Sequence, residues 1–279
     1  MLQTLLSITS LGAIARRAIA QAQDATVWGV TSRGIFLHLS SGWVIFLSNE
    51  QFRGPLTLNS NLSSRLFQNL RPGLTVNICS NRLIFNTLEI EVDTDSAVIW
   101  SALAPRTVSP ASLAGRFDRL KSIYRNVRAA RGDTISGKLL SDSMIAGRPE
   151  ISRITPVLEN YLGLGEGLTP AGDDLVLGFL LAINRWGDLL DHDLDVHKIN
   201  IAIQQTVYQK TNTLSANLIE CASLGQADER LVLALDGILT GEPDPETCIT
   251  HLLSWGHTSG ANTLTGMTAA IAPVISHDW

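Results

Sequence analysis

The sequence predicts an α+β protein, in which a β-rich N-terminal part, a small barrel or sandwich, packs on a mainly α-helical C-terminal part. Up to about residue 103, short β-branched and aromatic runs alternate with Ser-, Gly- and Asn-containing turns. After Pro105 the apolar residues instead recur at spacings of three and four, as on one face of a helix. We therefore divide the chain into an N-terminal helix at 1–24, a β-rich domain at 25–105 and a helical domain at 106–279.

The first residues, MLQTLLSITSLGAIARRAIAQAQ, predict an amphipathic helix that docks on the body of the protein. A secretory signal carries its positive charge before the apolar stretch, whereas Arg16 and Arg17 follow it. The apolar run is also short and interrupted by Ser, Thr and Gly, which argues against a membrane span. A targeting segment is the less favoured alternative.

Turn residues divide the β-rich part into short strands. The stretch TVWGVTSRGIFLHLSSGWVIFLS holds strand-like runs separated by Ser40, Ser41 and Gly42, which predicts a hairpin. Further along, Pro72-Gly73 and Ser80-Asn81 mark two more turns. Several short strands with regular turns are typical of a barrel or a sandwich.

Capping signals place the helices of the C-terminal part. Ser109 followed by Pro110 predicts a helix start, and Thr169-Pro170 predicts another. One long helix is expected over about 196–223, and the last helix from near Ser259 to before Pro273.

Composition excludes several classes of protein. Apolar residues make up 45% of the chain and charged residues 17%, which favours a globular protein over a disordered one. The formal net charge of −5 argues against nucleic acid as a partner, because phosphate binding needs a basic surface. The three cysteines form no CxxC pair, which fits a reducing cytoplasm better than a disulfide framework or a zinc cluster. We expect a cytoplasmic protein without a membrane or nucleic-acid partner.

The stretch GEGLTPAGDDLVLGFLLA, residues 165–182, sets Asp173 and Asp174 against an apolar run. If Thr169 caps the helix and Pro170 is its first residue, one acidic residue in the first turn is explained by the macrodipole, at ~0.3–1 kcal/mol. The second is not, because consecutive helix positions point about 100° apart and the next residues are apolar around much of the circumference. At least one carboxylate should face protein or a cleft, where burial requires a partner. The loop therefore predicts a ligand site.

Two helical segments resemble each other: GDDLVLG at 172–178 and GANTLTG at 260–266. Residues four apart share a helix face, so Gly178 lies over Asp174 and Gly266 over Asn262. Glycine costs ~1 kcal/mol against alanine inside a helix. The repeated glycine predicts that another helix backbone, or a ligand, approaches closely at both places.

The ligand chemistry of the Asp173–Asp174 loop stays open between two alternatives. The spacing G-x-G-x-G differs from the dinucleotide motif G-x-G-x-x-G, and the preceding residues are helical in pattern, which argues against a dinucleotide site. The two carboxylates oppose a bare anion. They could hold Mg²⁺ or another hard cation through oxygen, or accept hydrogen bonds from an amide or amino group of a substrate. The loop at 258–260, beside Asn262, could supply N–H groups to an anionic end.

Three blocks carry a resemblance to a known family: LGLGEGLTPAGDDLVLG at 162–178, TNTLSANLIECASLGQA at 211–227 and GHTSGANTLTG at 256–266. They resemble a bacterial family typified by a subunit of the oxamate carbamoyltransferase of anaerobic allantoin (purine) catabolism. The resemblance extends over most of the chain, including its first third. The third block is looser, since the family more often has Asp where this chain has Asn262.

The resemblance implies a component of a carbamoyltransferase-like system that acts, with other subunits, on oxalurate or oxamate and carbamoyl phosphate, or on a related small carboxamide. The catalytic residues that it implies are Asp173, Asp174 and His257, and Asp173 and Asp174 would be the ligands of any divalent cation such as Mg²⁺. The substrate-binding residues that it implies are Gly165, Gly167, Thr169, Gly172, Ser215, Asn217, Thr258, Ser259 and Asn262. Arg148, Arg153 or a partner would supply a cation for phosphate. The alternative is a non-catalytic assembly or sensing subunit that binds a small carboxylate or amide.

Two further features each have two interpretations. The run DHDLDVH at 191–197 fits a turn in which Asp195 caps the next helix better than it fits a metal site, because it lacks the glycine and terminal Glu of a calcium loop. His257 is either a general acid or hydrogen-bond donor, or a structural histidine at a helix entry.

Overall fold

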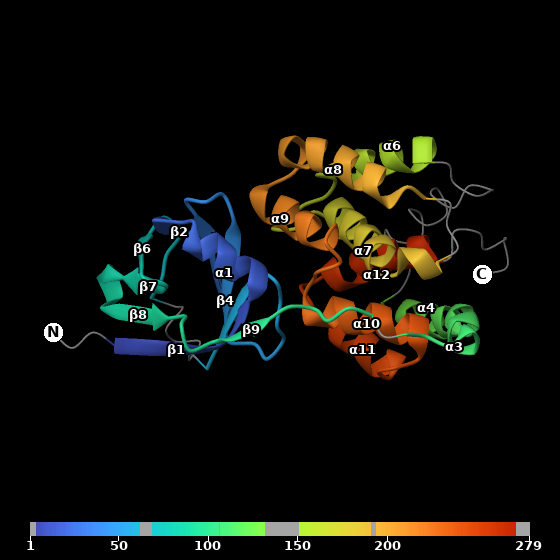
Figure 1. Ribbon diagram of the computed structural model, residues 1–279, viewed down its shortest axis with the longest axis horizontal. Helices are drawn as coiled ribbons and strands as arrows, with labels where there is room; N and C mark the ends of the chain where they lie inside the picture. Colours follow the sequence, from blue (N-terminus) through green and yellow to red (C-terminus); the bar gives the residue numbers. More distant parts are fainter. Residues whose placement is uncertain (1–3, 62–68, 106, 132–150, 191–193, 272–279) are drawn as a thin grey trace. The chain divides into compact units, whose positions relative to one another are not determined.

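The computed structural model describes residues 4–61, 69–105, 107–131, 151–190 and 194–271. The chain divides into two compact units, Met1–Ala102 and Leu103–Trp279, which we call the barrel unit and the helical unit (Figure 1). Strands dominate the first and helices the second, so the predicted α+β class is confirmed.

The barrel unit is a closed sheet of eight strands with a short ninth strand at its seam. The strands run in the order β5-β4-β3-β2-β6-β7-β8-β1, and β1 pairs with β5 to close the barrel. The ninth strand, β9, extends the edge that β8 forms against β1. The bounds are β1 Thr4–Gly12, β2 Asp24–Thr31, β3 Gly34–Leu39, β4 Val44–Ser48, β5 Thr57–Ser60, β6 Thr75–Cys79, β7 Arg82–Phe85, β8 Ile90–Asp93 and β9 Val98–Trp100. Of the two architectures expected, the barrel is the one formed.

The predicted hairpin turns lie between antiparallel strands. Gly42 sits between β3 and β4 with a φ of 87°, and its N–H donates to the carbonyl of Leu39. Ser80 and Asn81 join β6 to β7, both with positive φ. Such turns match the right-handed twist of the paired strands.

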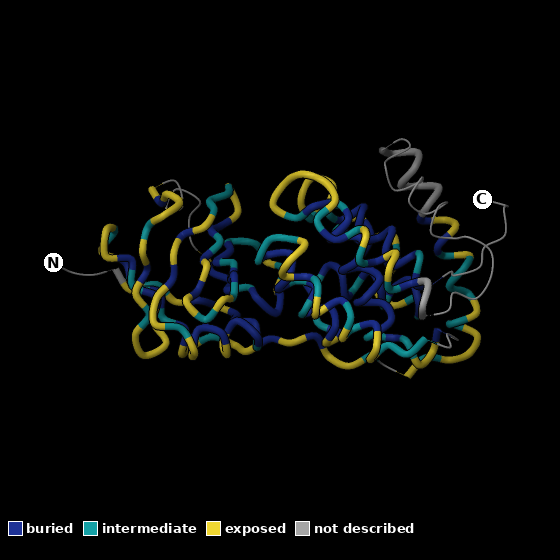
Figure 2. Tube along the Cα trace, turned by 90° about the horizontal axis from the view of Figure 1, so that it is seen from above, coloured by how far each residue is buried: buried dark blue, intermediate teal, exposed yellow. Residues whose placement is uncertain are grey.

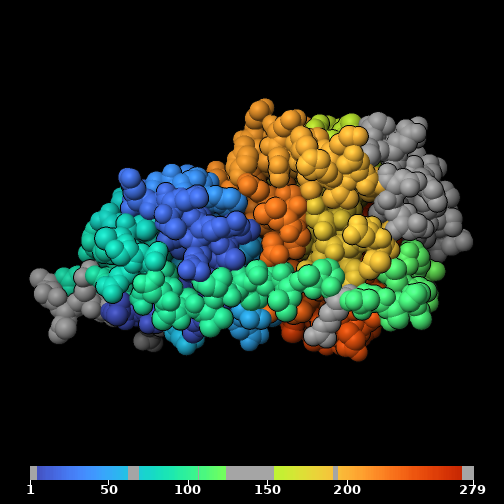
Figure 3. Space-filling model, in the orientation of Figure 1, coloured from blue at the N-terminus to red at the C-terminus, as the bar shows by residue number. Residues whose placement is uncertain are grey.

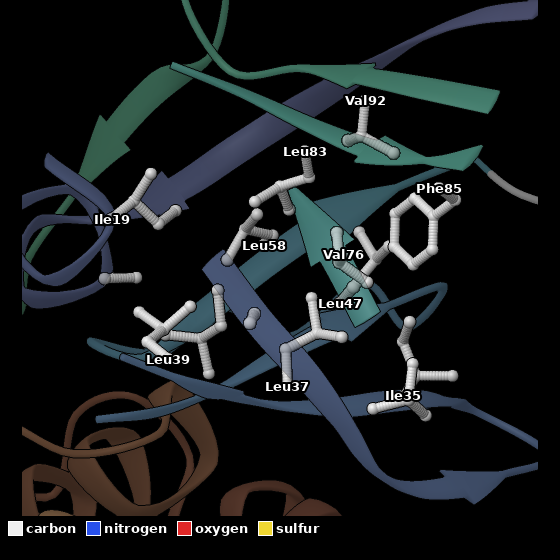
Figure 4. Packing of buried hydrophobic residues seen from close by; sticks show 14 of the residues in the cluster. Ile19, Ile35, Leu37, Leu39, Leu47, Leu58, Val76, Leu83, Phe85 and Val92 are labelled. Carbon is white, nitrogen blue, oxygen red and sulfur yellow. The ribbon is translucent and has the colours of Figure 1, made fainter. Parts of the chain in front are cut away.

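Apolar side chains fill the interior of the barrel (Figure 4). Leu37, Leu47, Leu58 and Leu83 are fully buried and point toward one another from four different strands. Helix α1, Ala13–Ala20, adds Ile19 to the same cluster. Inward and outward residues alternate along the strands, as in other small barrels.

The predicted helix over 1–24 is wrong for its first half. Residues Thr4–Gly12 form strand β1, and only Ala13–Ala20 are helical. β1 pairs with β5 on one side and with β8 and β9 on the other, and its Ile8 and Leu11 face the barrel core. Hydrogen bonds to strands distant in sequence decide this segment, and they outweigh its local amphipathic pattern.

The helical unit is built around α7, which is buried along most of its length (Figure 2). Its helices are α3 Pro110–Ala114, α4 Arg116–Arg131, α6 Ile151–Tyr161, α7 Ala171–Trp186, α8 Val196–Lys210, α9 Thr213–Ala222, α10 Glu229–Thr240, α11 Pro245–Leu253 and α12 Ser259–Ile271. Short 3₁₀ turns occur at Asn86–Leu88 in the barrel unit and at Gly187–Leu189 after α7. In the described part of the chain, no helix combines the length and hydropathy needed to cross a lipid bilayer.

Helix starts follow the capping signals in two of the predicted places. The Ser109 hydroxyl accepts from the N–H of Ser112 at the start of α3, and the Asp195 carboxylate accepts from the N–H of Lys198 at the start of α8. The cap interpretation of Asp195 is thus confirmed, while residues 191–193 lie outside the described residues. The single helix expected over 196–223 is wrong, because the chain breaks at Thr211 and Asn212.

An ion pair joins the extended segment after Ala102 to the interior of the helical unit. Arg185 makes two hydrogen bonds to Asp236, of 2.8 and 2.7 Å, and a third of 2.8 Å to the carbonyl of Leu103. The indole of Trp186 donates to the same carboxylate at 2.8 Å. The segment that begins at Leu103 runs over the surface of the helical unit in this way (green, Figure 3).

Candidate functional site

Three segments that are distant in sequence meet at the first turn of α7. They are the loop at 163–170, the start of α9 at 211–215 and the start of α12 at 259–262. Figure 1 shows α9 and α12 beside α7. Each segment belongs to one of the three blocks singled out in the sequence.

The glycines of the first block give the loop its shape. Gly165 and Gly167 have φ values of 115° and 102°, which only glycine adopts without strain. Gly172 has no such φ, but a Cβ there would lie 2.0 Å from the carbonyl oxygen of Tyr161, the last residue of α6. These three predicted binding residues therefore have a structural role, which is to let the loop turn and to let α7 start against α6.

Thr169 does not cap α7 in the predicted way. Pro170 occupies the cap position and the helix begins at Ala171. The Thr169 hydroxyl instead lies 3.0 Å from the hydroxyl of Ser259 and donates a long, 3.5 Å hydrogen bond to Asp174 Oδ2. It connects two segments that are 90 residues apart.

Asp173 is a buried carboxylate whose two oxygens both accept hydrogen bonds. Oδ1 accepts from the N–H of Gly163 at 2.7 Å, and Oδ2 accepts from the hydroxyl of Thr211. The side chain is therefore fixed between the loop and the residue that precedes α9. Because charge-assisted hydrogen bonds compensate for its burial, architecture alone accounts for Asp173.

Asp174 is 1% exposed and has a different environment. Burial raises its pKa to about 7, and the negative charge of Asp173 adds to the effect. Hydrogen bonds from the side chains of Ser259, Thr169 and Asn262 oppose this rise. Asp174 thus changes its protonation state near neutral pH, in direct contact with two hydroxyls and an amide.

The two matching glycines mark where α7 and α12 touch. A Cβ on Gly178 would lie 2.0 Å from the carbonyl oxygen of Thr263, and a Cβ on Gly266 would lie 1.9 Å from that of Leu175. Of the two expected causes, the close approach of a helix backbone is therefore the one found. The contacts advance in the same direction along both helices, so α7 and α12 run parallel and begin at the same end of their contact.

This parallel packing places Asp174 at the start of two helices. The positive ends of both macrodipoles favour a negative charge there. The raised pKa of Asp174 shows that burial outweighs the effect. Without the two glycines, the backbones would stand farther apart and Ser259 and Asn262 would move away from the carboxylate.

The start of α9 contributes polar groups to the same region. The Asn212 side chain accepts from the N–H of Ser215, which caps α9, and donates to the carbonyl of Leu168 at 3.0 Å. The Ser215 hydroxyl is buried and has no hydrogen-bond partner among the described residues. Asn217 donates to the hydroxyl of Tyr208 at 3.0 Å, so this predicted binding residue connects α9 to α8.

The remaining predicted residues lie before α12. His257 and Thr258 are exposed, and the Thr258 carbonyl accepts from the N–H groups of Ala261 and Asn262. Nothing in these contacts decides between the two interpretations of His257. Arg148 and the side chain of Arg153 lie outside the described residues.

The divalent-cation alternative finds little support in this geometry. In the ranges that the structure describes, no group of three or more His, Cys, Asp or Glu side chains is placed to hold a metal ion. Both oxygens of Asp173 already accept hydrogen bonds from the protein. The second alternative, in which a carboxylate exchanges hydrogen bonds with a substrate amide, needs only Asp174.

Thr211 and Asn212 are the residues of the site that sequence reasoning missed. Both lie within the second block, but a helix predicted to run through 196–223 hid them in its interior. The run Thr-Asn-Thr is itself a capping signal, since Asn is favoured at the N-cap position.

Comparison with known proteins supports the resemblance for the helical unit. Residues 161–271 match the family model described as oxamate carbamoyltransferase subunit AllH. The matched segment runs from the end of α6 to the end of α12 and contains all three blocks; the barrel unit lies outside it. Searches of curated proteins and of solved structures find no match.

Proposed function

We propose that this chain is a component of a carbamoyltransferase-like system that binds oxalurate or oxamate, or a related small carboxamide, and takes part in carbamoyl transfer to or from phosphate together with other subunits. The match of residues 161–271 to an oxamate carbamoyltransferase subunit family supports the class of reaction. The observation that carries the proposal is the convergence of all three matched blocks on Asp174, a buried carboxyl with a pKa of about 7.

The proposed reaction moves a carbamoyl group between nitrogen and oxygen. A phosphate oxygen attacks the terminal carbonyl carbon of oxalurate and forms a tetrahedral oxyanion. The bond from that carbon to the internal nitrogen then breaks, which gives carbamoyl phosphate and oxamate. The departing nitrogen takes up one proton and the phosphate hydroxyl loses one, so the net reaction is balanced.

Asp174 is suited to carry that proton. A general acid works best when its pKa lies near the working pH, and burial brings Asp174 there. In its protonated form it would donate to the departing nitrogen, and it would recover the proton from phosphate. The hydroxyls of Thr169 and Ser259 are fixed donors beside it and could stabilise the oxyanion.

The route of the substrate to Asp174 is expected to pass the loop at 163–170. Asp174 itself is almost inaccessible, whereas residues 164–168 are exposed, including the side chains of Leu164 and Leu168. Exposed leucines beside a buried polar site favour either movement of this loop or its coverage by another subunit.

The test is an assay of carbamoyl phosphate formation from oxalurate and phosphate, with the chain alone and with the candidate partner subunits. Asp174→Asn keeps the shape of the side chain but cannot donate an acidic proton, and we expect it to lower kcat by about 10²–10⁴-fold. The matched control is Asp188→Asn, the same change on an exposed residue after α7, which should leave turnover unchanged. Turnover of the Asp174→Asn complex at the wild-type rate would refute a catalytic role.

A non-catalytic sensing subunit is the second candidate, and the near-complete burial of Asp174 favours it. In that case Asp174 would recognise the amide of a bound ligand without transferring a proton. Asp174→Asn would then abolish binding of oxamate to the chain, measured by calorimetry, while the assembled complex would keep its kcat at saturating substrate.

A further inference from the structure

We propose that the barrel unit carries a second, separate ligand site, on its outer surface, for a small zwitterion of the α-amino-acid class. The site lies where β9, β1 and β5 adjoin and where the loop at 49–53 folds over them. Its hollow has a volume of about 470 Å³, within the usual range for small-molecule sites.

The hollow is outside the barrel, because the interior is filled. Leu58 and Leu11 point into the apolar core (Figure 4 labels Leu58). Their neighbours Asn59 and Ser10 therefore point outward, since successive residues of a strand face opposite sides. Ser10 lies opposite Asn59 in the pairing of β1 with β5, and opposite Val98 in the pairing of β1 with β9. All three outward residues line the hollow.

A β-bulge sets this arrangement. The register between β1 and β5 shifts between Ile8 and Ser10, and Thr9 is the extra residue. Bulges bend a strand and re-aim its side chains, and they occur often beside functional sites. Here the bulge brings Ser10 directly against Asn59 at the seam where the barrel closes.

The loop at 49–53 buries these two polar side chains although they face away from the core. Asn59 Nδ2 donates to the carbonyls of Glu50 and Phe52, at 2.9 and 2.7 Å, which fixes the loop over the strands. These two bonds fix the orientation of the amide, so Asn59 Oδ1 is held on the opposite side. Asn59 is 5% exposed and Ser10 is 8% exposed.

Two hydrogen-bonding atoms of the site are not used by the fold. Within the described ranges, neither Asn59 Oδ1 nor Ser10 Oγ has a hydrogen-bond partner. Buried polar atoms in native proteins are nearly always paired, and exceptions point to a ligand or to bound water. Both lie in the lining of a hollow large enough for either.

The groups around the hollow indicate the chemistry of the ligand. Asn59 Oδ1 can only accept, so the ligand must present an N–H or O–H donor to it. The carboxylate of Glu50 also lines the hollow, beside its ion-pair partner Arg33, and favours a cationic donor. The guanidinium of Arg53 lines it too, over the ring of Trp100, and is suited to a carboxylate. A cationic donor and a carboxylate on one small molecule describe an amino acid.

The test is thermal shift and calorimetry on the full chain with a panel of L-amino acids at millimolar concentrations. At least one should raise the melting temperature, while its amide lacks the carboxylate, its hydroxy acid lacks the ammonium group, and neither should. Ser10→Ala removes a hydroxyl that nothing else in the described ranges uses, so the fold should be unaffected, and we expect binding to weaken about tenfold. Arg53→Met, on an exposed residue, should weaken it at least as much.

Two control variants show whether binding depends on the hollow itself. Ser7→Ala makes the same change on β1 outside the hollow and should leave the affinity unchanged. Asp174→Asn, in the helical unit, should also leave it unchanged, so failure of the proposed function and failure of this inference can be told apart. The inference is overturned if no amino acid binds, which would mean that water alone fills the hollow, or if Ser10→Ala and Arg53→Met bind as wild type does.

Discussion

Replacing Gly178 by alanine should separate α7 from α12 and destabilise the protein. The added Cβ would lie 2.0 Å from the carbonyl oxygen of Thr263, whereas ordinary contact begins at 3.4 Å. The two backbones would have to move apart by about 1.4 Å, and neither atom belongs to a flexible side chain. Overpacking of this kind costs up to about 3 kcal/mol, and the better helix propensity of alanine returns ~1 kcal/mol. We expect a net loss of about 2 kcal/mol.

Urea unfolding followed by circular dichroism measures this loss, and the midpoint of thermal unfolding should fall by about 4–8 °C. Gly187→Ala is the matched control just after the same helix, because its Cβ would lie 3.5 Å from the nearest atom, a methyl group of Val196, which is ordinary contact. It should be neutral or stabilising by up to about 1 kcal/mol.

A double variant tests the mechanism of the loss. Gly266→Ala alone should cost a similar amount, since its Cβ would lie 1.9 Å from the carbonyl oxygen of Leu175. If one separation of the helices accommodates both methyl groups, the two losses are less than additive. Wild-type stability of Gly178→Ala, or strict additivity of the pair, would refute the argument that one close contact holds these helices together.

Three further outcomes are expected. Asp173→Asn replaces an acceptor of two hydrogen bonds by a group that can accept only one of them, so the free energy of unfolding should fall by about 1–3 kcal/mol in urea titrations, with Asp188→Asn unchanged. Because the folded pKa of Asp174 is raised from 3.8 to about 7, its protonated form contributes stability that is complete below pH about 4 and lost as the pH rises through 7; unfolding between pH 4 and 8 should show this decline in the wild type and lack it in Asp174→Asn. Asp236→Ala leaves the buried Arg185 guanidinium without its carboxylate and should cost about 3–5 kcal/mol in the same assay, whereas Lys198→Ala, which breaks an exposed pair, should cost under about 1 kcal/mol.

Local chemistry in the sequence was enough to identify most helices and turns and the block that carries the site. Ser109, Asp195 and the turn at Ser80-Asn81 act on residues within three or four positions of themselves, so their effect can be read from the chain. The repeated glycines indicated a close contact for the same reason, because their cost in a helix requires a compensating neighbour.

Tertiary structure alone decided what those residues contact. β1 is a strand because β5 and β8 lie beside it, against its own helical pattern. Asp173 and Asp174 are adjacent and chemically identical, yet Thr211 and Gly163 fix one, while Ser259 and Asn262 surround the other. Burial and partners supplied by distant segments set a carboxyl group's pKa and its hydrogen bonds, and these partners have no signature in the residues next to it.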